Sequence, residues 1–165
     1  MTVELVLPTT ELYTAWQEAH AEWGPGLHED GFGLQESDDV DTAEGFARWI
    51  ARLQAESDAG TCLWIVEDGQ VQGGIALRYR YNDRVGHIGY GVRPSARGRG
   101  IATCALRQLL DRARDRNLGR VLLVCAADNE GSVRTIERNG GRLDEIRPTP
   151  HGPTRRYWID LPPRD

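Results

Sequence analysis

A short basic stretch with two glycines, VRPSARGRGIAT (residues 92–103), carries the clearest chemical signal in the sequence. It lies between an apolar, strand-like run and a segment with helical spacing. Gly98 and Gly100 leave the backbone open to close approach by a ligand, and the first N–H groups of the following helix have no partners within it. Together with the helix dipole and the charges of Arg97 and Arg99, these groups predict a binding site for an anion such as phosphate.

The same stretch does not match other glycine-rich motifs. A dinucleotide-binding fingerprint needs a third glycine where Thr103 stands, and a Walker loop needs a lysine, which the sequence lacks. Arginine–glycine segments that bind RNA normally repeat within disordered sequence, whereas this one opens a regular helical pattern. The net charge of −5 also argues mildly against nucleic acid as a partner. A loop that holds phosphate is the best of these interpretations.

The loop needs a strand before it and a helix after it, and the sequence patterns supply both. They predict strand, two helices, three strands, helix, strand, helix and two strands, which together form a mixed sheet with helices on its faces. In the strand at 85–92, glycine stands at alternate positions, which indicates a bulge or the close approach of another segment. No repeat or linker divides the chain, so we expect one domain over residues 1–165.

The composition argues against several classes of protein. No apolar run is long enough to span a membrane, and Glu4 and Glu11 do not fit a secretory leader, so we expect a cytoplasmic protein without a membrane partner. The three cysteines, Cys62, Cys104 and Cys125, lie far apart and indicate neither a disulfide framework nor a metal site. A homodimer is compatible with the sequence but is not indicated by any motif.

In its context, the motif from Arg97 to Ala102 resembles the (Gln/Arg)-x-x-Gly-x-(Gly/Ala) signature of the GNAT acyl-CoA N-acyltransferases. The glycine-bearing strand, the helix after the loop, the apolar strand at 121–126 and the segment from Asn129 to Gly141 follow the order of that family. The likeness covers about residues 61–160, and only element order extends it further. It implies a GNAT-like α/β (α+β) fold with a mixed, mostly antiparallel sheet of about seven strands flanked by four helices.

The resemblance implies an acyl-CoA-dependent N-acyltransferase with acetyl-CoA as co-substrate and no metal. The backbone near Gly91 would pair with the pantetheine arm, Asn129 would hydrogen-bond this arm, and the loop would bind the pyrophosphate. The full set of residues expected to contact coenzyme A is Gly91, Val92, Arg93, Arg97, Gly98, Arg99, Gly100, Ile101, Ala102, Thr103, Asn129 and Ser132.

Many GNAT enzymes have a tyrosine seven residues after this asparagine, as the acid for the leaving thiolate, but here that position is Ile136. The form Asn-x-x-Ser-x-Arg resembles the subgroup that includes ribosomal-protein N-terminal and antibiotic acetyltransferases, and Ser132 is a substitute donor. Its alternative role is that of a small polar residue in a first helical turn.

The amine must also lose a proton. An alkyl ammonium with a pKa of about 10.4 is deprotonated only about once in 10^3.4 at pH 7. We expect His87 to be the general base, because it lies on the glycine-bearing strand and histidine titrates near neutrality. The alternative is a structural histidine with a backbone partner, and Tyr90 is a weaker catalytic candidate.

In this family the N-terminal helices, the loop between them and the last strand pair usually frame the acceptor. Acidic and aromatic residues there suit a cationic amine, and we expect contacts from His28, Glu29, Asp30 and Tyr157. The predicted function is transfer of an acetyl group to the primary amine of a small cationic molecule by direct attack, without a covalent enzyme intermediate. Two alternatives stay open: a protein or peptide N-acetyltransferase, and a non-catalytic acyl-CoA-binding module.

Overall fold

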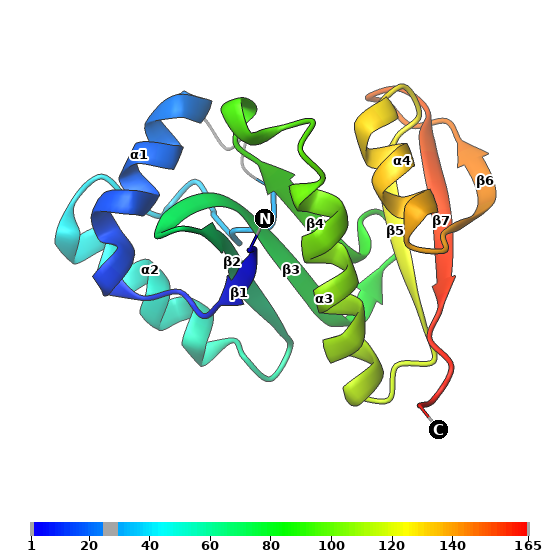
Figure 1. Ribbon diagram of the computed structural model, residues 1–165, viewed down its shortest axis with the longest axis horizontal. Helices are drawn as coiled ribbons and strands as arrows, with labels where there is room; N and C mark the ends of the chain where they lie inside the picture. Colours follow the sequence, from blue (N-terminus) through cyan, green and yellow to red (C-terminus); the bar gives the residue numbers. More distant parts are fainter. Residues whose placement is uncertain (1, 25–29, 165) are drawn as a thin grey trace.

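The computed structural model describes residues 2–24 and 30–164, and its centre is a seven-stranded sheet (Figure 1). The strands are β1 (Glu4–Val6), β2 (Gly60–Glu67), β3 (Gln70–Asn82), β4 (Gly86–Val92), β5 (Arg120–Ala126), β6 (Arg142–Arg147) and β7 (Thr154–Asp160). They lie in the order β1-β2-β3-β4-β5-β7-β6. Neighbours are antiparallel except β4 and β5, which run parallel. The mixed, mostly antiparallel sheet predicted from the sequence is thereby confirmed.

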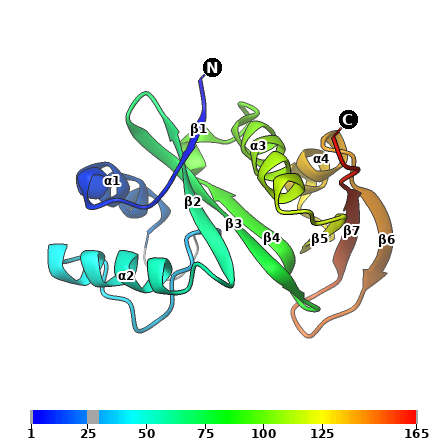
Figure 2. The same cartoon turned by 90° about the horizontal axis from the view of Figure 1, so that it is seen from below.

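In the described part of the chain, four α-helices cover the sheet, as expected. They are α1 (Tyr13–Trp23), α2 (Ala43–Ala55), α3 (Ile101–Asp115) and α4 (Glu130–Arg138), and short 3-10 turns at Thr10–Leu12 and Pro94–Ala96 precede α1 and α3. Helices α1 and α2 lie on one face of the sheet and α3 and α4 on the other (Figure 2). Among the described residues, no helix combines the length and the apolar character needed to cross a membrane.

The two faces of the sheet bury different kinds of side chain. Against α3 and α4 the buried residues are mainly aliphatic. Against α1 and α2 they are largely aromatic, and the five large rings are Trp16, Phe32, Phe46, Trp49 and Trp64. Each of these rings is at most 1% exposed, and full burial of one large apolar side chain contributes about 1.5–3 kcal/mol. These tryptophans are therefore core residues.

The glycines of β3 and β4 admit a segment from between α1 and α2. A Cβ atom on Gly74 would lie 2.6 Å from the Phe32 ring, and one on Gly91 would lie 3.1 Å from the carbonyl oxygen of Asp30. Gly31, at φ +89°, packs so closely that its own Cβ would lie 2.3 Å from the Gly74 carbonyl oxygen. The close approach predicted from the glycine pattern is confirmed, and the approaching group is this segment.

Candidate functional site

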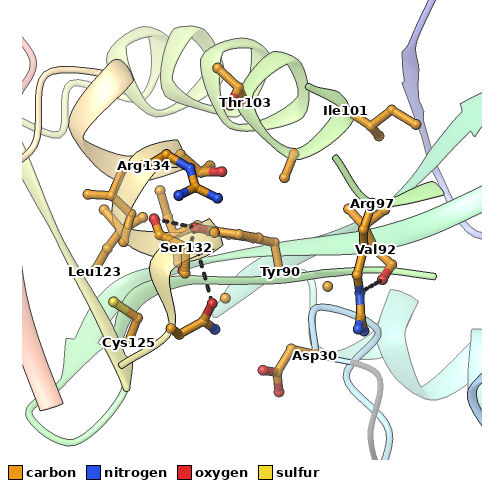
Figure 3. A pocket seen from close by; sticks show the side chains of 18 of the residues that line it. Asp30, Tyr90, Val92, Arg97, Ile101, Thr103, Leu123, Cys125, Ser132 and Arg134 are labelled. Carbon is orange, nitrogen blue, oxygen red and sulfur yellow. Dashed lines mark hydrogen bonds between the residues drawn. The ribbon is translucent and has the colours of Figure 1, made fainter. Parts of the chain in front are cut away.

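A pocket opens in the sheet where β4 and β5 separate. The two parallel strands register only at Gly86 and Ile88, both opposite Leu123. Beyond this point the strand ends 89–92 and 124–126 line a cavity of about 730 Å³. The first turns of α3 and α4 and the segment at Asp30 form the other walls (Figure 3). The volume is that of a site for a small molecule or cofactor.

The loop before α3 forms one end of the pocket. Gly98 and Gly100 have φ angles of +79° and +80°, a left-handed conformation that strongly favours glycine. A Cβ atom on either residue would meet no heavy atom within 4 Å, so both face open space. Because no side chain caps α3 at Gly100, the first N–H groups of this 15-residue helix are available to a ligand. This end of the pocket can therefore hold an anionic group.

Ten of the residues predicted to contact coenzyme A line the pocket: Gly91, Val92, Arg97, Gly98, Gly100, Ile101, Ala102, Thr103, Asn129 and Ser132. Arg93 and Arg99 do not. The Arg93 guanidinium is buried in an ion pair with Glu22 of α1, at 3.0 Å. Arg99 donates two hydrogen bonds of 2.9 Å to the carboxylate of Glu67 on β2. The side chains of these two arginines thus tie the loop to neighbouring elements, and their contacts with coenzyme A stay predictions.

Helix α4 contributes two basic residues that the sequence analysis missed, Arg134 and Arg138. Their spacing of four residues places them on one face of the helix, the signal by which they could have been found. Arg97 lies along the pocket on the other side, where its Nε–H donates to the Val92 carbonyl oxygen at 2.9 Å. Three guanidinium groups thus border the cavity and favour a polyanionic ligand.

Two hydroxyl groups meet inside the pocket. The Tyr90 phenol, from β4, lies 2.7 Å from Ser132 Oγ in the first turn of α4. Asn129 Oδ1 accepts a hydrogen bond from the Ser132 N–H at 3.1 Å, which caps the helix and leaves the Asn129 amide NH₂ for a ligand. Burial raises the pKa of Tyr90 to about 12, against the opposing effect of its bond to Ser132. The phenol therefore stays protonated at neutral pH and can donate a hydrogen bond.

His87 lies where β4 and β5 still pair, and it does not line the pocket. Its Nδ1 accepts a hydrogen bond from the Leu122 N–H at 2.9 Å, so the neutral ring carries its proton on Nε2. Burial lowers the pKa of His87, and the rings of Tyr81 and Trp158 pack around it. The geometry favours the structural histidine with a backbone partner over the predicted general base, because neither ring nitrogen is an acceptor facing the pocket.

The residues predicted to contact the acceptor do not all lie at the pocket. Asp30 lines the pocket, and so does Trp23, one of the aromatic residues of the acceptor region. Tyr157 is 1% exposed within the aliphatic core, so no ligand can reach it. His28 and Glu29 lie outside the described residues. Across the described part of the chain, no three His, Cys, Asp or Glu side chains gather into a group that could hold a metal ion.

Solved structures share this fold over nearly the whole chain. RimL, the ribosomal L7/L12 α-N-protein acetyltransferase in complex with coenzyme A, has a TM-score of 0.77 at 17% identity, covering 98% of this chain and 95% of that one. The microcin C7 self-immunity acetyltransferase MccE, in complex with acetyl-CoA and AMP, has a TM-score of 0.71 at 17% identity, covering 96% and 92%. The ribosomal-protein-S5-alanine acetyltransferase from Vibrio fischeri has a TM-score of 0.75 at 15% identity, covering 98% and 94%.

Sequence comparison gives the family. No curated protein matches the sequence significantly. Residues 12–141, most of the chain, match the model of the acetyltransferase (GNAT) family. This match includes the loop before α3 and the start of α4, the two places where the pocket offers helix termini. The chain therefore belongs to the GNAT acetyltransferases, which transfer an acetyl group from acetyl-CoA.

Proposed function

We propose that this chain transfers an acetyl group from acetyl-CoA to the primary amine of a small cationic molecule by direct attack. The observation that supports this most is that one pocket combines two kinds of lining group. Backbone N–H groups of α3 and the guanidinium of Arg97 line it, and so do the carboxyl group of Asp30 and the ring of Trp23. The first combination suits a polyanion and the second suits a cation.

The residues present fit coenzyme A. Left-handed Gly98 and Gly100 keep the loop backbone open, and the uncapped start of α3 offers N–H groups to a pyrophosphate. Asn129 lines the pocket and its amide would donate to the pantetheine arm, and Arg134 and Arg138, which line the pocket too, add positive charge. When bound, acetyl-CoA supplies the thioester carbonyl that the amine attacks.

Ser132 and Tyr90 are proposed to protonate the departing sulfur. Either hydroxyl of this pair can be the donor; when the phenol donates to Ser132 Oγ, the serine's own hydrogen is free for a thiolate. The Tyr90 phenol thereby assists Ser132 as the proton donor, a role that the side chain of Ile136 cannot fill because it has no hydroxyl group. The phenol assists best when protonated, which agrees with the raised pKa of Tyr90.

A protein or peptide α-amine is the second candidate acceptor, because two of the three solved structures described above are named as ribosomal-protein acetyltransferases. Both kinds of amine are cationic near neutral pH and suit the carboxyl group of Asp30. The test is release of coenzyme A thiol from acetyl-CoA with spermidine, an aminoglycoside, an amino acid amide, and peptides that begin with serine or alanine.

We expect thiol release that depends on one class of amine and is accompanied by a mass gain of one acetyl group on that amine. Release of coenzyme A thiol with the peptides alone would show that the acceptor is a protein or peptide α-amine. Binding of acetyl-CoA without release by any amine would contradict catalysis and favour the acyl-CoA-binding module.

A further inference from the structure

We propose that Asp30 is the general base that takes protons from the attacking amine. This inference rests on the proposed function and assigns the proton transfer that His87, which accepts a hydrogen bond from the Leu122 N–H outside the pocket lining, is not placed to perform. Four observations support it: the titratable residues that line the pocket, the packing of the backbone around Asp30, the position of Asp30 across β4 from Tyr90 and Ser132, and the charged groups around its carboxylate.

The pocket contains few groups that could accept a proton. Among the described residues that line it, Asp30 is the one carboxylate, and no histidine is present. Burial raises the pKa of the Cys125 thiol and raises that of Tyr90 to about 12, so both hold their protons near neutral pH. Arginine guanidinium groups do not give up their protons in proteins. Asp30 is thus the lining residue that is ready to act as a base.

The backbone around Asp30 is fixed against the sheet. Its carbonyl oxygen lies where a Cβ on Gly91 would be only 3.1 Å away, and the next residue, Gly31, packs directly on the Gly74 carbonyl. Phe32 then enters the aromatic core, 1% exposed, with its ring centroid 5.6 Å from that of Trp16. The anchored segment holds the carboxyl group at the pocket without help from a long flexible side chain.

Asp30 stands across β4 from the two hydroxyl groups. Successive residues of a strand point to opposite faces, so Tyr90 points to one face and the Cα hydrogens of Gly91 to the other. Asp30 packs at the Gly91 position, while the Tyr90 phenol contacts Ser132 (Figure 3). The base therefore lies on one side of the strand and the acid on the other. This arrangement suits a reaction in which the amine nitrogen attacks the thioester carbon from one side and the sulfur leaves from the other.

The surroundings of Asp30 strengthen it as a base. Burial of the carboxyl group raises its pKa, while the Arg78 guanidinium from β3 acts in the opposite direction. Arg97 lines the same pocket from the loop before α3. The residue as a whole remains exposed to solvent, so protons can leave it for water. A carboxylate whose pKa moves toward the working pH is a better base than an ordinary aspartate.

The protons balance as follows. The ammonium loses two protons on becoming an amide. Asp30 accepts the first and passes it to water, which frees the nitrogen lone pair to attack the thioester carbon. As the C–N bond forms and the C–S bond breaks, the second proton also leaves through Asp30, while Ser132 gives one proton to sulfur and recovers it from water. Each turnover therefore releases one net proton.

The test compares Asp30→Asn with Asp58→Asn, which removes the same charge from an exposed position outside the pocket. The measurement is kcat/KM for the most active amine of the panel from pH 6 to pH 10, with calorimetric binding of acetyl-CoA. At pH 7 we expect Asp30→Asn to lose about 10²–10⁴-fold and Asp58→Asn to stay near wild type. The loss should shrink as the pH approaches the pKa of the amine, about 8 for an α-amine and about 10.4 for an alkyl amine.

The outcomes separate this inference from the proposed function. If wild type neither binds acetyl-CoA nor releases thiol, the proposed function itself is wrong. If wild type is active and Asp30→Asn matches it at every pH, Asp30 is not the base. A large loss that is equal at pH 7 and pH 10 would also overturn the inference, because it would show that Asp30 holds the cation without removing its proton.

Discussion

The two ends of the pocket present different kinds of chemical group to a ligand. The end at α3 uses backbone: two left-handed glycines and the uncapped N–H groups of a helix, with arginines around them. The end at Asp30 uses one side chain, held in place because Gly74 and Gly91 let a distant segment lie on the sheet. A backbone site depends on local sequence, whereas a side-chain site depends on packing between segments. The variants below should therefore affect one end and spare the other.

Among the variants below, the largest effect is expected at the reaction centre, where Tyr90 meets Ser132. Ser132→Ala should lower kcat about 10²-fold with unchanged affinity for acetyl-CoA, because the thiolate then leaves without its proton donor. Tyr90→Phe should cost about tenfold, since the serine loses only the hydrogen bond that orients it. In steady-state kinetics the double variant should be no slower than Ser132→Ala alone, because the phenol acts through the serine. Multiplying losses would contradict the pairing at 2.7 Å.

A smaller effect should distinguish two neighbouring arginines. Arg97→Ala removes a guanidinium that lines the pocket, and calorimetry should show acetyl-CoA binding weakened about tenfold. Arg99→Ala is the matched control, because its side chain is held by Glu67 outside the pocket lining. It should leave affinity within about twofold and lower the free energy of unfolding by about 1 kcal/mol. Equal losses of affinity would show that charge alone matters and that the loop geometry does not.

These arginines also show what the sequence could predict. Gly98, Gly100 and the helix start lie within a few residues of one another, so their joint chemistry was readable before the fold was known. The partners of Arg93 and Arg99 are Glu22 and Glu67, far away in the sequence, and no local pattern indicates which arginine they hold.

Contacts between residues far apart in the sequence also explain why the structure differs from the predictions for His87 and Tyr157. Strand alternation gives opposite faces to His87 and Tyr90, but it does not say that the His87 ring accepts the Leu122 N–H. It likewise does not say that Tyr157 points into the aliphatic core. The order of the strands and α-helices, by contrast, follows from patterns along the chain, and the predicted order agrees with the structure.

The acceptor end can be disturbed by one methyl group. Gly74→Ala would place Cβ 2.6 Å from the Phe32 ring, so Phe32 must move and the free energy of unfolding should fall by about 1–3 kcal/mol. The shift should carry Asp30 with it and lower kcat/KM for the amine about threefold, with acetyl-CoA affinity retained. Gly119→Ala, where no heavy atom lies within 4 Å of the added carbon, is the control in urea unfolding. A loss of acetyl-CoA affinity in Gly74→Ala would show that the two ends are not separate.

The smallest effect on activity is expected at His87. In His87→Gln the amide oxygen can accept the Leu122 N–H, so kcat/KM should stay within about threefold of wild type from pH 6 to pH 9. A tenfold loss that follows a single titration near neutrality would restore His87 as the base.

His87 should also influence how the free energy of unfolding depends on pH. Burial lowers the pKa of His87, so the unfolded chain, where histidine titrates at about 6.5, binds this proton more strongly. The free energy of unfolding of wild type should therefore be fully retained above about pH 6.5 and fall as the pH drops below it. Urea unfolding of His87→Gln should show a smaller fall over the same range. An unchanged pH dependence would contradict the burial of a neutral ring.

The central claim, that the glycine loop and α3 form an acetyl-CoA site, is tested most directly by unfolding the wild-type protein with and without acetyl-CoA. Binding to the folded state alone should stabilise the protein by about 2.7 kcal/mol at a hundredfold excess of acetyl-CoA over its Kd. Gly140→Ala should keep this gain, because Gly140 has the same left-handed φ but lies outside the pocket, whereas Gly98→Ala should reduce it. No stabilisation of wild type at millimolar acetyl-CoA would contradict the account.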